Sequence, residues 1–190
     1  MTQQNLTVRE AVVSRRSIKL FNGQPVSKKD ILTIIEDATW APNHGNREPW
    51  RFVVAVEDNL PAILNVIRDV TIPSWSELSA EELAKQMAKF TAAGAYVFVV
   101  MPEDRRQKER LEDFAAAATL IQNMQLLAWD KGIGSCWKTP PLIENPVFNE
   151  KLGVKPGERI IAMLQLGYYD VAPKGKERKS IDQVVTFLGE

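Results

Sequence analysis

One long helical segment, from about Gln107 to Lys131, constrains the fold of this chain more than any other feature. Its middle, FAAAATLIQNMQLLAW, carries apolar residues on several faces instead of one stripe. A helix that is apolar nearly all round is buried on most sides. We therefore expect this helix to lie centrally, to end at Gly132, and to pack closely against the rest of the chain or against a second copy.

Five further helices are predicted from their start signals. Thr7 and Ser79 begin capping boxes, each with a glutamate three residues later. Ser27 precedes a segment whose apolar residues recur at helical spacing: Ile31, Ile34, Ile35 and Ala38. Asp58-Asn59 and Asn145-Pro146 are the remaining start signals. These signals predict helices over about 8–15, 28–41, 60–70, 80–93 and 146–152.

Strand-sized apolar runs lie between these helices. WRFVVAVE (50–57), AYVFVVM (95–101) and RIIAMLQLGYY (159–169) are rich in β-branched and aromatic residues, and GSCWKT (134–139) is a shorter candidate. The second run is almost continuously apolar, so we expect it to be covered on both faces. Helices and strands do not alternate strictly. The pattern predicts an α+β fold, with a central mixed or antiparallel sheet flanked by helices and residues 1–190 in one domain.

Charge and cysteine content exclude several classes of protein. The 24 Lys and Arg residues balance 24 Asp and Glu residues, so no overall field attracts nucleic acid or an anionic membrane. No apolar run approaches the length of a membrane span, and the N-terminus does not resemble a signal peptide. Cys136 is the only cysteine, which rules out an internal disulfide. We expect a cytoplasmic protein with no nucleic-acid or membrane partner.

No sequence-local catalytic apparatus is present. The chain lacks the nucleophile-elbow, zinc-protease, phosphate-loop and dinucleotide-binding motifs. A single histidine and a single cysteine make a metal site or a Cys–His nucleophile improbable, and we expect no metal. Either a cofactor carries the chemistry or the protein is not catalytic.

Two cationic clusters, one near each end of the chain, need an explanation. Residues 14–19 read SRRSIK, and residues 174–179 read KGKERK. The first cluster could be a helix C-terminus at which cations offset the helix dipole, and the second a solubilising tail. Alternatively, both converge on one ligand, where arginine binds phosphate, lysine supplies a point charge and serine contacts a polar ring edge.

Four fragments together resemble one known family. RRSIKLF, APNHGNREPWRFVV, IGSCWKTP, and LGYYD followed by PKGKERKS occur in the order and spacing of the nitroreductase family of FMN flavoproteins. The chain looks most like the short, single-domain YdjA-like type. The resemblance covers nearly the whole chain and implies a homodimer with FMN at the subunit interface. It implies cofactor-binding roles for Arg15, Arg16, Ser17, Lys19, Trp40, His44, Asn46, Trp137, Lys138, Thr139, Lys176 and Arg178.

The resemblance also implies how these residues act. Arg15, Arg16 and Ser17 match the motif that holds the ribityl phosphate, and Lys176 and Arg178 match cations that reach the same phosphate. Lys19 matches a basic residue near flavin N1 and O2, where a positive charge stabilises the reduced ring. His44 and Asn46 match a loop that approaches the partner subunit's FMN. Trp40 precedes that loop, and Trp137, Lys138 and Thr139 match a segment that contacts the flavin.

The function implied is FMN-dependent NAD(P)H oxidoreduction of nitroaromatics, quinones or similar acceptors. Transfer would be ping-pong, with two electrons moving as hydride and no residue needed as acid or base. Two departures from the family pattern affect substrate preference: Glu48 stands where glutamine is common, and Lys138 replaces an arginine. The alternatives are a dehalogenating or flavin-fragmenting enzyme of the same fold, or a non-catalytic FMN-binding protein.

Overall fold

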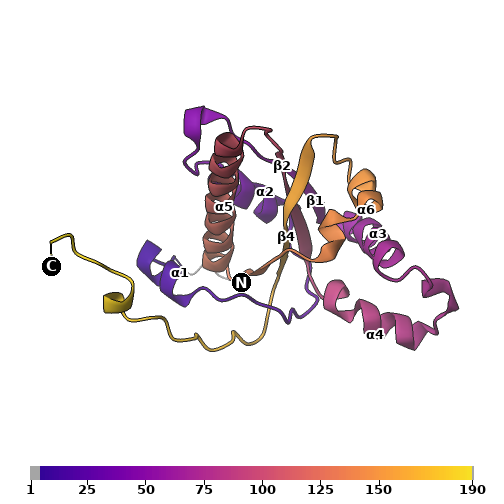
Figure 1. Ribbon diagram of the computed structural model, residues 1–190. Coiled ribbons are helices and arrows are strands. Elements are labelled where there is room, and N and C mark those ends of the chain that lie inside the picture. Colours follow the sequence, from indigo (N-terminus) through magenta and orange to yellow (C-terminus); the bar gives the residue numbers. More distant parts are fainter. Residues whose placement is uncertain (1–4, 190) are drawn as a thin grey trace.

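The computed structural model describes residues 5–189, and four of its strands form one antiparallel sheet (Figure 1). The strands are β1 (Arg51–Val56), β2 (Ala95–Pro102), β3 (Gly134–Lys138) and β4 (Glu158–Gly167). Their order across the sheet is β1-β2-β4-β3, and each neighbouring pair is antiparallel. The sheet expected as mixed or antiparallel is therefore antiparallel. An isolated parallel bridge joins Ser17 to Ser135 at the edge formed by β3.

The predicted helices are confirmed, with small shifts at their ends. They are α1 (Val8–Ser14), α2 (Lys28–Ala38), α3 (Leu60–Thr71), α4 (Ala80–Thr91), α5 (Gln107–Asp130) and α6 (Pro146–Lys151). Both predicted capping boxes are present. The side chain of Asn59 makes no capping hydrogen bond, and a proline stands in the first turn of α3 instead. Within the described part of the chain, no helix is both long and apolar enough to cross a membrane.

The sheet lies between two helical layers. Figure 1 shows α2 and α5 on one face and α3, α4 and α6 on the other. Side chains of β2 alternate between the two resulting cores, with Val97 and Val99 in the first and Tyr96 and Phe98 in the second. This two-sided burial is why the sequence of β2 is almost continuously apolar, as expected.

Helix α5 is central over most of its length but not over all of it. Leu120, Ile121 and Met124 are fully buried, whereas Leu111 and Phe114 nearer its start are 60% and 45% exposed. Its end follows the prediction. Gly132 has a φ of 72°, and the N–H of Ile133 donates to the carbonyl oxygen of Ala128 at 2.8 Å.

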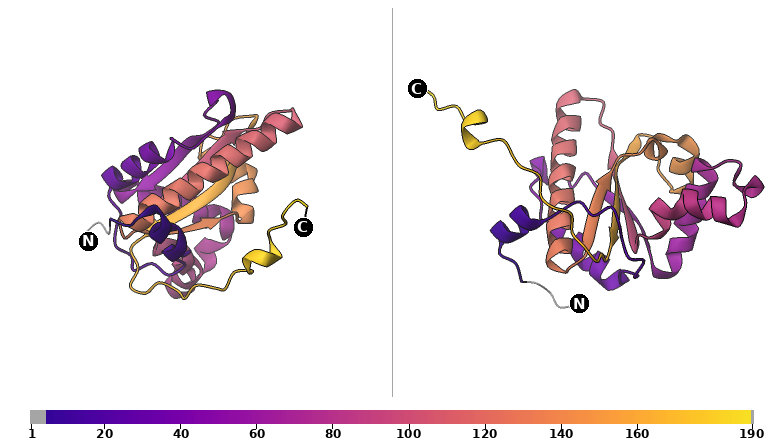
Figure 2. Two further views of the ribbon diagram at one scale, coloured as in Figure 1. Left: turned by 90° about the vertical axis from the view of Figure 1, so that its left-hand side faces the viewer. Right: turned by 90° about the horizontal axis from the view of Figure 1, so that it is seen from below.

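The two ends of the chain meet at the C-terminal end of α5. Residues 15–22 run from α1 along the edge of β3, and residues 168–178 follow β4 into the same region. Beyond this point the chain leaves the body of the molecule. Both views of Figure 2 show the last residues as an extended arm with one short helical turn, Ile181–Gln183.

Candidate functional site

The segment after α1 is held against the edge of β3 by one hydrogen bond and one glycine. The N–H of Ile18 donates to the carbonyl oxygen of Ser135 at 2.9 Å. A Cβ on Gly134 would lie only 2.5 Å from Cγ1 of Ile18 and 2.7 Å from Cδ1 of Tyr169. Ile18 is buried, while Ser17 and Lys19 are exposed. The close approach that Gly134 permits therefore directs Ser17 and Lys19 outward.

The segment after β4 crosses this first segment. The N–H of Asn22 donates to the carbonyl oxygen of Tyr168 at 2.9 Å, which ties the two segments together. Farther along, a Cβ on Gly175 would lie 2.4 Å from Nη2 of Arg16. The absence of a side chain at position 175 thus lets the C-terminal segment pass directly over a guanidinium group.

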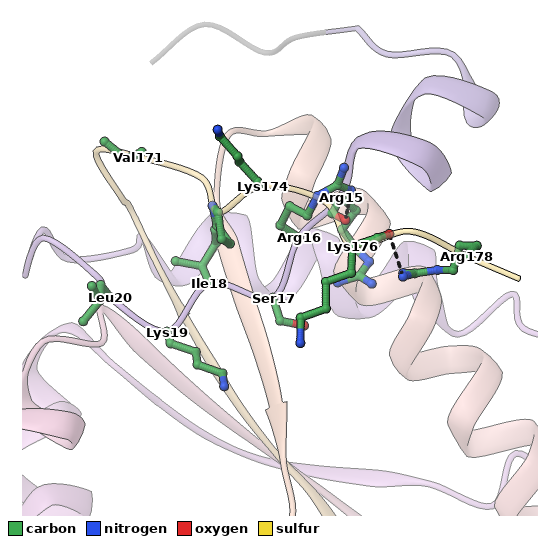
Figure 3. Close-up of a pocket in the computed structure, with 11 residues that line it drawn as sticks. Arg15, Arg16, Ser17, Ile18, Lys19, Leu20, Val171, Lys174, Lys176 and Arg178 are labelled. Carbon is green, nitrogen blue, oxygen red and sulfur yellow. Dashed lines mark hydrogen bonds between the residues drawn. The ribbon is translucent and has the colours of Figure 1, made fainter.

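The two segments enclose a cavity of about 600 Å³ (Figure 3). Arg15, Arg16, Lys176 and Arg178 group at one end, and Lys19 lies toward the other. The predicted meeting of the two cationic clusters is therefore observed. The lining residues are Arg15, Arg16, Ser17, Ile18, Lys19, Leu20, Val171, Pro173, Lys174, Lys176 and Arg178.

The cations of this cavity have no carboxylate partners among the described residues. None of the ion pairs found between residues 5 and 189 includes a lysine or arginine of the lining. Nε and Nη1 of Arg15 are buried and have no acceptor. Burial lowers the pKa of Arg15, and the neighbouring charges of Arg16 and Arg178 lower it further. Buried, unsatisfied N–H groups are unfavourable, and a phosphate group would satisfy them with charge-assisted hydrogen bonds.

Arg16 differs from Arg15 because it is already partly engaged. Its Nη1 donates to the carbonyl oxygens of Val13 at 2.8 Å and Arg15 at 2.9 Å, at the end of α1. The helix-C-terminus interpretation is thus correct for Arg16, which offsets the negative end of the α1 dipole. Arg178 donates to the carbonyl oxygen of Lys176 at 3.1 Å, which shapes the opposite wall.

The predicted residues of β3 and its end, Trp137, Lys138 and Thr139, divide between two places. Lys138 is half-buried, and burial lowers its pKa; the positive charges of Lys19 and Lys89 act in the same direction. Lys138 is therefore electrostatically part of the cationic region. Trp137 and Thr139 line a separate cavity of about 370 Å³, together with Phe114 of α5.

The loop predicted to approach a cofactor lies far from the cavity of its own chain. His44 and Asn46 are exposed, and Trp40 is 87% exposed. Arg47 ties this loop to α5 through an ion pair with the buried Asp113. At the other end of α5, Nε1 of Trp129 donates to Oγ of Ser14 beside the cavity at 2.9 Å.

The separation between loop and cavity follows from the geometry of α5. Asp113 and Trp129 are sixteen residues apart, which at 1.5 Å per residue is about 24 Å. Figure 1 shows the 41–49 loop and α1 near opposite ends of α5. A single chain therefore brings six of the twelve predicted residues to the first cavity and places Lys138 near them. Trp137 and Thr139 line the second cavity, and Trp40, His44 and Asn46 lie apart from both.

Two features of the region were missed in the sequence. The apolar part of the lining was not assigned a role: Ile18 and Leu20 lie within the RRSIKLF fragment, and Val171 lies outside the quoted fragments. In the folded chain Leu20 and Val171 are large apolar side chains left 86% and 82% exposed. The Arg47–Asp113 pair joins positions 66 residues apart, so no local pattern marks it.

Groups of acidic, histidine and cysteine side chains suited to a metal ion are absent from the described residues. The cavity offers nitrogen donors and one hydroxyl instead. Its chemistry is that of an anion site with an apolar wall.

Comparison with known proteins gives the same family for sequence and fold. The model of the nitroreductase family matches residues 12–168. YfhC of Bacillus subtilis is 37% identical to this chain over 179 residues, which are 94% of this chain and 92% of YfhC. The name of YfhC describes it provisionally as an NAD(P)H nitroreductase. YdjA of Escherichia coli, with the same provisional assignment, is 26% identical over 158 residues, covering 83% of this chain and 86% of YdjA.

Solved structures agree with these sequence matches. A nitroreductase-like family protein from Bacillus cereus superimposes with a TM-score of 0.83 at 34% identity, with both chains covered completely. NfnB from a Sphigopyxis strain is described as an FMN- and NADPH-dependent nitroreductase. It superimposes with a TM-score of 0.75 at 20% identity, and the match covers 97% of this chain and all of NfnB. At this identity the likeness concerns the fold alone. The family match over most of the chain and its close relatives lead to one conclusion: this protein belongs to the nitroreductase family.

Proposed function

We propose that this protein is an FMN-dependent oxidoreductase that takes electrons from NADH or NADPH and passes them to nitroaromatics, quinones or similar acceptors. The observation that carries the proposal is the cavity of unpaired cations, above all Arg15, whose Nε and Nη1 are buried without an acceptor. The family assignment supports the choice of FMN, because FMN combines a phosphate dianion with a flat, largely apolar ring. A cavity with a cationic end and an apolar wall suits both parts.

Each group of residues has a role in this proposal. Arg15, Arg16, Lys176 and Arg178 hold the phosphate, and Ser17 contacts the ribityl chain or the pyrimidine edge. Lys19 and Lys138 lie toward the ring, where positive charge favours the reduced form. When bound, FMN would supply the redox chemistry, namely hydride acceptance from the nicotinamide and two-electron donation to the acceptor. The chain itself orients the ring, neutralises the phosphate and sets the electrostatic potential.

A homodimer is part of the proposal, and the geometry of α5 supports it. The loop with His44 and Asn46 lies about 24 Å from the cavity of its own chain, measured along α5. It can therefore contact a flavin in that cavity only from a second copy. Two-fold symmetry with the α5 helices antiparallel would place the loop end of one copy beside the cavity end of the other. The exposed Leu111 and Phe114 of α5 would then be covered.

The direct test is the colour of the purified protein and its response to reductant. Wild type is expected to retain FMN and to bleach under anaerobic NADH or NADPH. Arg15→Ala and Arg178→Ala should each weaken FMN affinity about 10- to 100-fold, because each removes charge-assisted hydrogen bonds to the phosphate. Lys179→Ala is the matched control, since Lys179 neighbours Arg178 on the same segment but does not line the cavity. Equal FMN dissociation constants for Arg178→Ala and Lys179→Ala would reject the phosphate role.

A further inference from the structure

The last turn of α4 is fixed to the sheet by a buried hydrogen-bond network. Gln165 of β4 is completely buried, and its Nε2 donates to the carbonyl oxygen of Lys89 at 3.0 Å and to Oη of Tyr96 at 2.8 Å. The Tyr96 hydroxyl in turn donates to the carbonyl oxygen of Phe90 at 2.7 Å. Two strands therefore hold the backbone of Lys89, so its side chain starts from a fixed position.

Lys138 lies on the same face of the sheet as this network. Cys136 is directly opposite Gln165 in the pairing of β3 with β4, and Lys138 is opposite Met163. Residues two apart on a strand share a face, so Lys138, Cys136 and Gln165 all lie on the side that α4 covers. Met163 packs in the core beneath α3 and α4, which agrees with this placement. The backbone of Lys89 is therefore held on the same face of the sheet as Lys138.

Three lysines from different segments, Lys19, Lys89 and Lys138, thus lie around β3: Lys19 follows the Ser17–Ser135 bridge, and Lys89 shares a face of the sheet with Lys138. Burial lowers the pKa of Lys138 most, and the positive charges of Lys19 and Lys89 lower it further. None of the three forms an ion pair with a carboxylate in residues 5–189. Nζ of Lys89 lies 5.0 Å from the centre of the Phe90 ring.

The position of Lys89 in a helical last turn does not explain this convergence. A cation there gains about 0.3–1 kcal/mol from the helix dipole wherever its neighbours are. This stabilisation by the helix dipole does not explain why two more lysines without carboxylate partners lie nearby. Unpaired charges of one sign instead attract an ion of the opposite sign. The phosphate of FMN belongs to the other end of the cavity, beside Arg15.

We propose that Lys89, together with Lys138, forms a subsite for a carboxylate or phosphate group on the molecule that exchanges electrons with the flavin. The inference rests on the proposed function and extends it to the charge of the substrate. The anionic group has two possible sources, a carboxylate on the acceptor or the 2′-phosphate of NADPH. Both are oxyanions that an ammonium pair recognises in the same way.

A binding measurement on the FMN-loaded protein tests the subsite without turnover. Benzoate and benzamide have nearly the same shape and differ in charge, and their dissociation constants can be read from the change in flavin absorbance. Lys89→Met keeps the apolar stem and removes the charge. It should reduce the preference for benzoate over benzamide about three- to fivefold, the effect of one solvent-accessible ion pair. Lys85→Met, one turn earlier on α4, is the matched control and should leave the preference at the wild-type value.

A kinetic arm identifies the source of the anionic group. We compare kcat/KM for 4-nitrobenzoate against 4-nitrobenzamide with NADH as reductant, and for NADPH against NADH with 4-nitrobenzamide as acceptor. A selective loss in the first ratio assigns the subsite to the acceptor, and a selective loss in the second assigns it to NADPH.

The inference is overturned if Lys89→Met leaves the benzoate preference and both kinetic ratios at their wild-type values. It is equally overturned if both members of every pair change alike. Failure of the proposed function gives a different result: wild type would not retain FMN, or neither nicotinamide would reduce it. In that case both the proposed function and the subsite that depends on it are rejected.

Discussion

Lys19 lies toward the opposite end of the cavity from the phosphate-side cations, on the exposed side of the segment that Ile18 anchors. Replacing it with methionine removes one charge near the ring and keeps most of the side-chain volume. We expect the two-electron midpoint potential of the bound FMN to fall by about 20–40 mV, since one nearby charge contributes on the order of 1–2 kcal/mol. Anaerobic titration with a reference dye measures this potential.

Lys19→Arg is the control for this measurement, because it keeps the charge and changes its shape. Its potential should lie closer to that of wild type than the potential of Lys19→Met. If both variants match wild type, Lys19 does not lie near the ring.

Glu158 permits a second prediction at the level of single residues. Nε of Arg51 donates to its carboxylate at 2.9 Å, the N–H of Lys155 donates to it at 2.8 Å, and the pKa of Glu158 falls to about 2, chiefly because of Arg51. The folded state therefore binds this proton more weakly than the unfolded state does. The resulting stabilisation is fully present above about pH 4.5 and is lost as the pH falls toward about 2.

Glu158→Gln should accordingly lower the free energy of unfolding at neutral pH by about 1 kcal/mol, a value reduced because solvent screens a partly exposed pair. Urea unfolding at a series of pH values should show the difference from wild type shrinking between pH 4.5 and pH 2. Glu150→Gln, at an exposed position of α6, should show no such trend. A difference for Glu158→Gln that is constant with pH would contradict the role assigned to the ion pair.

At the scale of elements, the edge of β3 couples the fold to the cavity through Gly134. A Cβ at this position would overlap Ile18 and Tyr169, so Gly134→Ala must push the 15–19 segment away. We expect a loss of about 1–3 kcal/mol in unfolding free energy from overpacking, together with weaker FMN binding. Thermal unfolding and flavin titration measure the two effects separately.

Gly153→Ala provides the comparison for this element. Gly153 has a φ of 65° and no neighbour that a Cβ would meet, so alanine there strains the backbone away from the cavity. The protein should lose stability but keep its FMN affinity. If Gly134→Ala also keeps full affinity, the position of the 15–19 segment does not determine binding.

The elements of this fold could be predicted because their signals are local. The capping boxes at Thr7 and Ser79, the stop at Gly132 and the apolar run of β2 each depend on a few neighbouring residues. The pairing of elements is not local. No residue pattern near Ser17 predicts its bridge to Ser135, which is 118 positions away. The strand order likewise depends on how the layers pack.

The same difference separates the predicted and the missed parts of the site. The two cationic clusters were recognisable because several cations stand together near each end of the chain. Lys89 was not recognisable, since a lysine in a last helical turn has an ordinary reason to be there. His44 and Asn46 were named only through the family resemblance, because an exposed histidine and asparagine in a loop have no distinctive chemistry of their own.

At the scale of the whole molecule, α5 relates the two halves of the proposed site. It carries the cavity at its C-terminal end and the 41–49 loop at its N-terminal end, with apolar side chains exposed between the loop and the buried middle. A two-fold axis across α5 would complete two sites at once and leave each chain with half of each. The extended arm, with Phe187 and Leu188 65% and 106% exposed, has the apolar surface expected of a segment that packs on a second copy.

This arrangement can be tested by complementation between two defective chains. One chain carries Arg15→Ala and Arg178→Ala in the cavity, and the other carries His44→Asp and Asn46→Asp in the loop. Each should bind FMN poorly alone, the first for lack of phosphate partners and the second because its carboxylates repel the ligand. After unfolding together and refolding, half of the dimers are mixed, and each mixed dimer has one site built only from unaltered segments. About a quarter of all sites should therefore recover wild-type FMN affinity. If cavity and loop acted within one chain, every site would keep a defect, and the refolded mixture would bind no more FMN than the two separate variants do.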